Sequence, residues 1–196
     1  MKKVSLILTC LLLGALTLSA QSTKFGIKSG HLKYETKTSG GMQYNELWFD
    51  DYGALRKQID QTPMEGMGIY KTEVLLRDGK SYVNAWFDNE RKDEGKMTEM
   101  GESGLNLLDP DAAYLKEKKI SVLGTETVFG KNCTIYSFKV KSMLRTVTYK
   151  VWVWQGITLK METRGALGAN NDQIVTEFTE NPKIPASTFA LPKVIK

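Results

Sequence analysis

Short stretches of alternating apolar and polar residues dominate the chain and predict a mainly β protein. Clusters of Gly, Asn, Asp and Ser separate these stretches, as hairpin turns require. The predicted strands are 30–37, 42–50, 54–61, 68–77, 81–88, 124–129, 133–141, 145–154, 157–164 and 173–179. So many short, closely connected strands predict one curved antiparallel sheet, or an unclosed β-barrel, with one or two short helices as a lid.

Residues 89–119 interrupt the alternation, because they are charged and rich in helix-forming residues. Asp109 can cap a helix that begins at Pro110, and the acidic start and basic end of this stretch suit the helix dipole. We therefore expect a short helix that ends near Lys119 and closes the sheet. Residues 181–192 contain three prolines, which predicts an extended segment at a sheet edge.

The two faces of several predicted strands differ in composition. In 145–154 one face is mostly aliphatic, whereas the other mixes Trp152 and Trp154 with polar residues. Strands 42–50 and 81–88 repeat this division, with Trp48 and Trp86 on the mixed face. Aromatic side chains among polar ones are common in ligand grooves. The alternative is a face that the helical segment and loops cover.

Two pairs of methionines lie in segments that we do not expect to be strands. Methionine adapts to irregular apolar shapes, so the pairs could form a flexible lid over an apolar cavity or simply fill the core. Coordination of Cu(I) is a third reading, which the lack of His or Cys near either pair disfavours. The predicted ligand-binding residues are Trp48, Trp86, Trp152, Trp154, Met64, Met67, Met97 and Met100.

Residues 1–20 have the features of a secretory signal peptide. Two lysines precede a long apolar run, and small residues lead to a predicted cleavage site near Ala20. An uncleaved membrane anchor is less favoured, because no basic cluster follows. Thr9 and the apolar residues after Cys10 disfavour a lipoprotein signal. We expect a secreted, periplasmic protein in which 21–196 form a single domain.

Charge and cysteine content narrow the possible functions. The 196 residues include 27 Lys and Arg and 22 Asp and Glu, and loss of Lys2 and Lys3 with the leader leaves a net charge of +3. This small and evenly spread charge argues against nucleic acid as a partner. Cys133 is the only cysteine after the leader, so an internal disulfide is excluded. Its strand-like surroundings predict a buried, inert thiol.

Motifs for catalysis and cofactor binding are missing from the sequence. His31 is the only histidine, which leaves a zinc site or a Ser-His-Asp triad without support. Nor does the chain contain a G-x-S-x-G motif, a P-loop or a dinucleotide-binding glycine pattern. We therefore expect no enzyme, no cofactor and no metal site, and a hydrolase is the least favoured function.

Several segments are similar in pattern to a family of exported proteins from Gram-negative, Bacteroidetes-type bacteria. The resemblance extends over most of 24–192 and is clearest in the segments 25–30, 48–53, 124–133, 149–162 and 184–192. That family is distantly similar to the LolA/LolB-like periplasmic lipoprotein carriers. The resemblance implies a LolA-like fold, an unclosed antiparallel barrel with a helical lid over an apolar cavity. It assigns no site residue.

The mixed aromatic face, the methionine pairs and the resemblance together predict a periplasmic binding protein or carrier for a lipid or another apolar ligand. Burial of an acyl chain would supply about 0.8 kcal/mol per methylene. The alternative is an envelope interaction or structural module without enzymatic activity, whose tryptophan face contacts a partner protein.

Overall fold

A computed structural model describes residues 23–89, 96–99, 105–141, 146–165 and 170–191. The predicted signal peptide, 1–20, lies outside these residues. Within the described part, helices are too short or too polar to cross a membrane.

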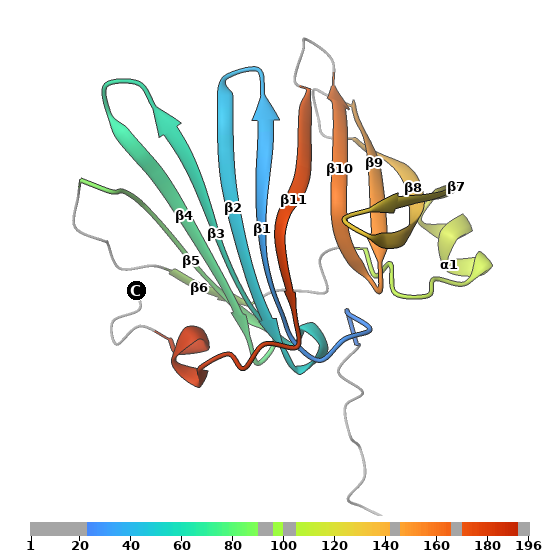
Figure 1. Cartoon of the computed structure of the whole chain (residues 1–196), viewed down its shortest axis with the longest axis horizontal. Coiled ribbons are helices and arrows are strands. Elements are labelled where there is room, and N and C mark those ends of the chain that lie inside the picture. The colour runs from blue at the N-terminus through green and yellow to red at the C-terminus, as the bar shows by residue number, and fades with distance from the viewer. Residues whose placement is uncertain (1–22, 90–95, 100–104, 142–145, 166–169, 192–196) are drawn as a thin grey trace, which may run out of the picture.

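Eleven antiparallel strands of the described residues form one sheet (Figure 1). They are β1 (Gly30–Thr38), β2 (Gly41–Asp50), β3 (Leu55–Met64), β4 (Gly68–Arg77), β5 (Lys80–Phe87), β6 (Lys96–Glu99), β7 (Ser121–Val128), β8 (Lys131–Lys141), β9 (Thr146–Trp154), β10 (Ile157–Gly165) and β11 (Asn171–Glu180). Their order is β6-β5-β4-β3-β2-β1-β11-β10-β9-β8-β7. The end strands β6 and β7 do not pair with each other, which confirms the predicted curved, unclosed sheet.

One strand lies where the sequence predicted none. β6 falls inside the charged segment that we expected to be irregular or helical, and it pairs with the first half of β5. Met97 is therefore a strand residue, and the expectation that it belongs to a non-strand segment is wrong. Pairing with β5 overrides the weak helical preference of so short a stretch.

The predicted helix exists but is shorter than expected. α1 spans Ala112–Glu117, and its N-cap is Asp111, whose carboxylate accepts a hydrogen bond from the Tyr114 backbone N–H at 2.7 Å. Asp109 was the wrong choice of cap. It has a positive φ of 46°, whereas an N-cap residue adopts the extended conformation that Asp111 shows, with φ −74° and ψ 168°. Tyr114 and Leu115 pack α1 onto β8 and β9.

Strands β1 to β5 pair without a bulge, so their side chains alternate strictly between two faces. We call the face that carries Leu32, Leu47 and Gln58 the inner face. The face that carries His31 and Trp48 is the outer face. The inner face of β2 and β3 borders the cavity described below.

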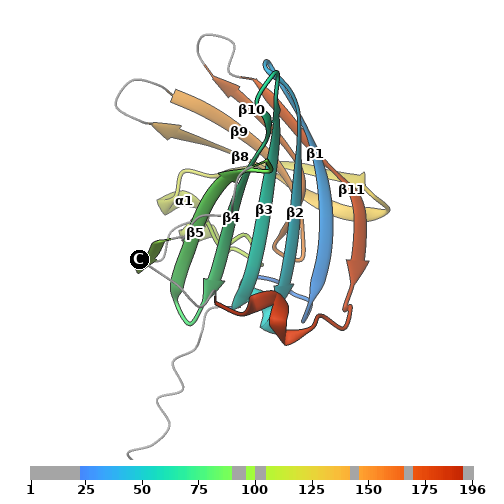
Figure 2. The same cartoon turned by 90° about the vertical axis from the view of Figure 1, so that its left-hand side faces the viewer.

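The C-terminal segment packs on the outer face instead of extending the sheet edge, so the edge prediction was wrong. It contains a 3-10 turn, η3 (Ala186–Phe189), which lies against the outside of the sheet in Figure 2. Phe189 and Ile184 contact a cluster that includes Leu75 and Tyr82. Burial of these apolar side chains explains why the segment crosses the face.

Three β-bulges interrupt the pairing of the described strands. One shifts the register of β1 against β11 between Lys33 and Tyr34, and another shifts β10 against β9 between Thr158 and Lys160. The third shifts β7 against β8 between Val122 and Gly124. Bulges increase the local twist and curvature of a strand pair. The bend brings β8, β9 and β10 against β1 and β2. The core that they share consists of Phe25, Leu32, Tyr34, Phe49, Val128, Cys133, Ile135, Trp152, Ile157, Leu159 and Val175.

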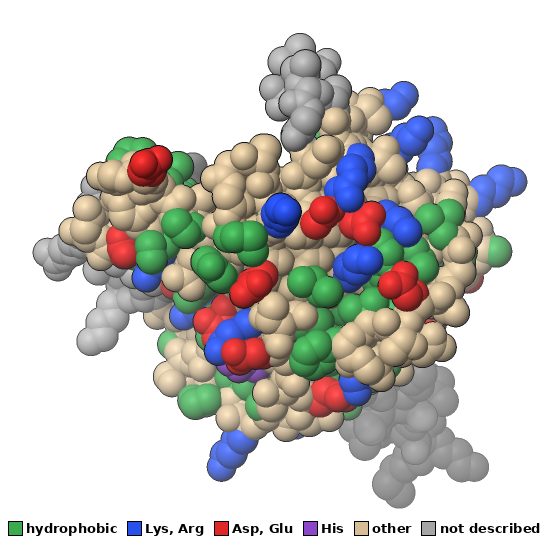
Figure 3. All heavy atoms as spheres, turned by 45° about the horizontal axis from the view of Figure 1, so that its top comes forward, with side chains coloured by type: hydrophobic (Ala, Val, Ile, Leu, Met, Phe, Trp, Pro, Cys, Tyr) green, Lys and Arg blue, Asp and Glu red, His purple; other side chains and the backbone are tan. Residues whose placement is uncertain are grey.

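The surface in view in Figure 3 mixes charges of both signs with hydrophobic side chains. Exposed ion pairs of the described residues include Lys33 with Glu177 and Arg164 with Asp172. Intermixed charges agree with the small net charge of the sequence.

Candidate ligand cavity

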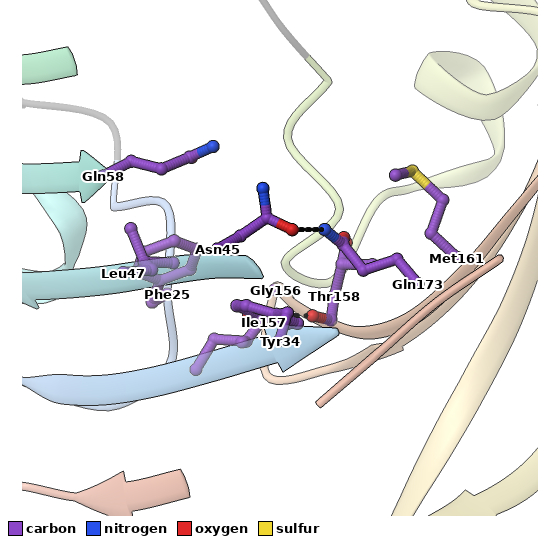
Figure 4. A pocket seen from close by; sticks show the side chains of 10 residues that line it. All are labelled: Phe25, Tyr34, Asn45, Leu47, Gln58, Gly156, Ile157, Thr158, Met161 and Gln173. Carbon is purple, nitrogen blue, oxygen red and sulfur yellow. Dashed lines mark hydrogen bonds between the residues drawn. The ribbon is translucent and has the colours of Figure 1, made fainter. Parts of the chain in front are cut away.

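A cavity of about 340 Å³ lies on the inner face, between β1–β3 on one side and β10–β11 on the other. Figure 4 shows its lining side chains, which come from segments far apart in the sequence. They are Phe25, Tyr34, Asn45, Leu47, Gln58, Gly156, Ile157, Thr158, Met161 and Gln173. The volume is within the range of ordinary small-molecule sites.

The apolar wall of the cavity depends on how the chain before β1 is held. The backbone N–H groups of Lys24 and Phe25 donate to the Tyr52 carbonyl oxygen at 3.1 Å, which fixes the Phe25 ring against Phe49 at 4.4 Å between centroids. Gly156 makes this path possible, because a Cβ atom there would lie 2.2 Å from the Lys24 carbonyl oxygen.

The polar wall is a chain of hydrogen-bonded side chains across four strands, which we call the amide chain. The Gln173 amide donates to Thr36 Oγ1 at 3.1 Å and to Asn45 Oδ1 at 3.0 Å, and Thr36 donates to Asn45 Oδ1 at 2.8 Å. Asn45 and Gln58 then each donate to Asp60 Oδ1 at 2.7 Å. Mutual pairing lets these groups occupy an inner face without the cost of unpaired polar atoms.

Tyr34 joins the two walls. Its hydroxyl donates to the Thr158 carbonyl oxygen at 3.1 Å, across the bend of the sheet. Burial raises the pKa of the Tyr34 phenol above its ordinary value, because the phenolate would lose its solvation. Tyr34 therefore stays a neutral hydrogen-bond donor that ties β1 to β10.

The structure does not gather the predicted tryptophans around this cavity. Trp48 and Trp86 lie on the outer face, and Trp48 stacks on His31 at 5.0 Å and packs beneath the C-terminal segment. Trp152 is 1% exposed, and its indole N–H donates to Glu126 at 2.7 Å. Trp154 instead borders a second hollow of about 220 Å³. Contact between these four residues and a ligand stays a prediction.

The methionine pairs are also apart from the cavity. Met64 is the last residue of β3, so the prediction of a non-strand segment is wrong for it as well, and Met67 lies in the following turn. They are 38% and 54% exposed. Met97 is on β6, and Met100 lies outside the described residues. A lid made of these residues likewise stays a prediction.

Chemically reactive groups are engaged in packing or pairing. His31 Nε2 lies 2.6 Å from Glu46 Oε1 on the outer face. Cys133 is fully buried, as predicted, and burial raises the pKa of its thiol. Among the residues that the structure describes, no three His, Cys, Asp or Glu side chains come together as a metal site would require.

None of the residues that line the cavity was singled out from the sequence. A usable signal was present, because Asn45, Gln58 and Asp60 occupy positions on the face of β2 and β3 that also carries Leu47. Uncharged amides at such positions indicate a network of side-chain hydrogen bonds on the inner face. Their partner Gln173 is on β11, and the pairing of β11 with β1 spans more than a hundred residues, so no local pattern reveals it.

No family model matches the sequence, and no curated protein does either. Similar solved structures include MucB in complex with MucA(peri), at 12% identity and TM-score 0.42, covering 84% of this chain and 54% of that chain. The chain thus spans about half the length of MucB. LprF from Mycobacterium bovis is similar at 12% identity and TM-score 0.36, covering 82% and 89%. A LolA superfamily protein from Nitrosomonas europaea has 8% identity and TM-score 0.41, covering 86% and 93%.

Proposed function

We propose that the chain is a periplasmic binding protein or carrier for a lipid or another apolar ligand, which occupies the inner cavity. The observation that supports this most is the cavity itself, which has an apolar wall on one side and the amide chain on the other. Small-molecule sites combine a mostly apolar lining with a few polar groups that orient the ligand. An amphiphile would place its chain against Leu47 and Met161 and its polar end near Gln58 or Gln173.

The first test is the mass of the native protein. Residues 21–196, purified from a bacterial periplasm, are examined by native mass spectrometry before and after organic extraction. A bound mass that extraction removes, identified as a lipid, is the expected result. A ligand-free mass, with no uptake of added lipids, would contradict the proposal.

A second test locates the site by filling the cavity. Leu47→Trp should reduce the binding of a fluorescent fatty acid by about tenfold or more, because the larger ring occupies the space of the chain. Ile174→Trp is the matched control, since Ile174 is an exposed residue outside the cavity lining. Trp86→Ala tests the tryptophan face in the same assay, and weakened binding in that variant alone would move the site to the outer face.

Exposed apolar residues at one end of the sheet favour the alternative, an envelope interaction module. β7 is an end strand, and Val122 and Leu123 on it are 52% and 54% exposed. An end strand with free backbone groups can pair with an extended segment of another protein. A photo-crosslinking residue at position 123, compared with one at the exposed Thr179, tests this in intact cells. One defined adduct from position 123 alone would favour the alternative.

A further inference from the structure

The inner face of β1 to β5 carries only two charged side chains, Arg56 and Asp60, both on β3. Arg56 lies directly opposite Phe49 on β2 and Leu76 on β4. Gln58, which lines the cavity, follows on the same face of β3 at roughly 7 Å, the rise of two residues. Arg56 is thus a half-buried residue between two apolar strand neighbours, next on its face to a residue of the cavity lining.

Arg56 has no partner for its charge among the described residues. Its Nε is buried and makes no hydrogen bond. Burial lowers the pKa of Arg56, and no carboxylate offsets this effect. Asp60 is about 13 Å further along the strand, and its Oδ1 already accepts from Asn45 and Gln58. Lys57, the next residue but on the outer face, lies 3.7 Å from Glu73.

A buried donor without an acceptor is rare in proteins and needs an explanation. The guanidinium presents a planar set of donors that matches a carboxylate or a phosphate. We propose that Arg56 binds the anionic group of an amphiphilic ligand, a carboxylate or phosphate, whose apolar chain extends past Gln58 into the cavity. This inference rests on the proposed function and adds the charge of the ligand to it.

The low polarity around Arg56 would strengthen such a contact. Phe49, directly opposite Arg56 on β2, is fully buried, and Phe25 packs on it, so the neighbour of Arg56 on this side is apolar and closed to water. The amide chain supplies neutral donors and acceptors further along β3 but no second positive charge. The inner face of β1 to β5 therefore offers one positive charge, that of Arg56, to one anionic group of a ligand.

Three probes test the inference on delipidated protein at about pH 8, where a carboxyl group is ionised. They are laurate, 1-dodecanol, which has the same chain without the charge, and acetate, which has the charge without the chain. We expect the wild type to bind laurate about tenfold or more tightly than dodecanol. Arg56→Met should abolish this preference, Arg56→Lys should retain part of it, and the control Lys57→Met should leave it unchanged.

The outcomes separate the inference from the proposed function. Equal affinities for laurate and dodecanol in the wild type would overturn the role of Arg56 and leave a neutral apolar site. No binding of either would overturn the proposed function itself. Acetate that binds as tightly as laurate would place a free anion at Arg56 and overturn the link to a chain.

Folding of the variants is checked by thermal melting. Arg56→Met removes an unpaired charge whose Nε is buried, so its melting temperature should not fall below that of the wild type. If it does unfold, Arg56→Lys still decides the question, because a reduced preference for laurate in that folded variant, with dodecanol binding intact, supports the fork-shaped contact. A preference in Arg56→Lys as large as that of the wild type would overturn the fork-shaped contact.

Discussion

The inner and outer faces of β1 to β5 differ in how their polar groups are paired, although neighbouring residues of the same strands supply both faces. On the outer face, polar and charged groups pair with one another, as in His31 with Glu46 and Lys57 with Glu73. On the inner face, apolar side chains alternate with hydrogen-bonded amides, and a single guanidinium is left unpaired. These outer-face groups are therefore paired within the chain, whereas the inner face has a cavity and an unused donor.

The tryptophans and the cavity lie on different faces of β1 to β5. The tryptophans of β2 and β5 lie on the face whose apolar parts the C-terminal segment covers, and Trp48 is part of that contact. The cavity has one phenylalanine and one tyrosine and otherwise depends on aliphatic, amide and glycine residues. The proposed ligand site therefore rests on a polar network and a cavity on the inner face, not on aromatic side chains.

The largest expected effect compares Phe49 with its neighbour Trp48. Phe49→Ala should lower the free energy of unfolding by about 3–5 kcal/mol, because the ring is fully buried against Phe25 and the cavity it leaves cannot close. Trp48→Ala should cost about 1–2 kcal/mol, since the indole is only partly buried beneath the C-terminal segment. Denaturant unfolding of both variants checks the order. A larger loss from Trp48→Ala would reverse the assignment of the two faces.

A smaller effect is expected from breaking the amide chain. Asn45→Leu leaves Asp60, Thr36 and Gln173 each without one hydrogen-bond partner, which should cost about 1–3 kcal/mol. Tyr44→Leu is the matched control, because Tyr44 is the preceding residue and is 45% exposed on the outer face. Its effect should stay within about 0.5 kcal/mol. Equal losses in urea unfolding would show that the amide chain contributes nothing specific.

The alternation of residues predicted most of the fold, because nearly every strand has turn residues at both ends. For example, Gly68–Arg77 has the predicted bounds. The alternation distinguishes the two faces of each strand, but it does not show which face is the inner one. Trp48 and Trp152 lie on the same side of the sheet by register, yet Trp48 is an outer-face residue and Trp152 belongs to the core. The bulges in β10 and β11 and the path of the C-terminal segment decide this, and both depend on contacts between distant parts of the chain.

The smallest expected effect concerns Cys133, which lies in the core together with Trp152. Burial raises the pKa of its thiol, so iodoacetamide at about pH 8 should not modify the native protein, whereas it should modify the unfolded chain rapidly. An unfolded thiol ionises near pH ~8.5. Above that pH the unfolded chain releases a proton that the native thiol keeps, so the free energy of unfolding should decrease as pH rises towards the raised pKa.

Below about pH 8.5 the thiol is protonated in both states and contributes no pH dependence. Cys133→Ala should therefore remove part of the alkaline decrease and leave the curve below it unchanged. Urea unfolding of residues 21–196 at a series of pH values, for the wild type and this variant, measures the difference. The other titrating groups are common to both proteins and cancel in the comparison. Rapid alkylation of the native protein, or identical slopes for the two proteins, would show that this side of β8 is open to solvent, and that the core on the tryptophan side of β9 is less closed than its contacts indicate.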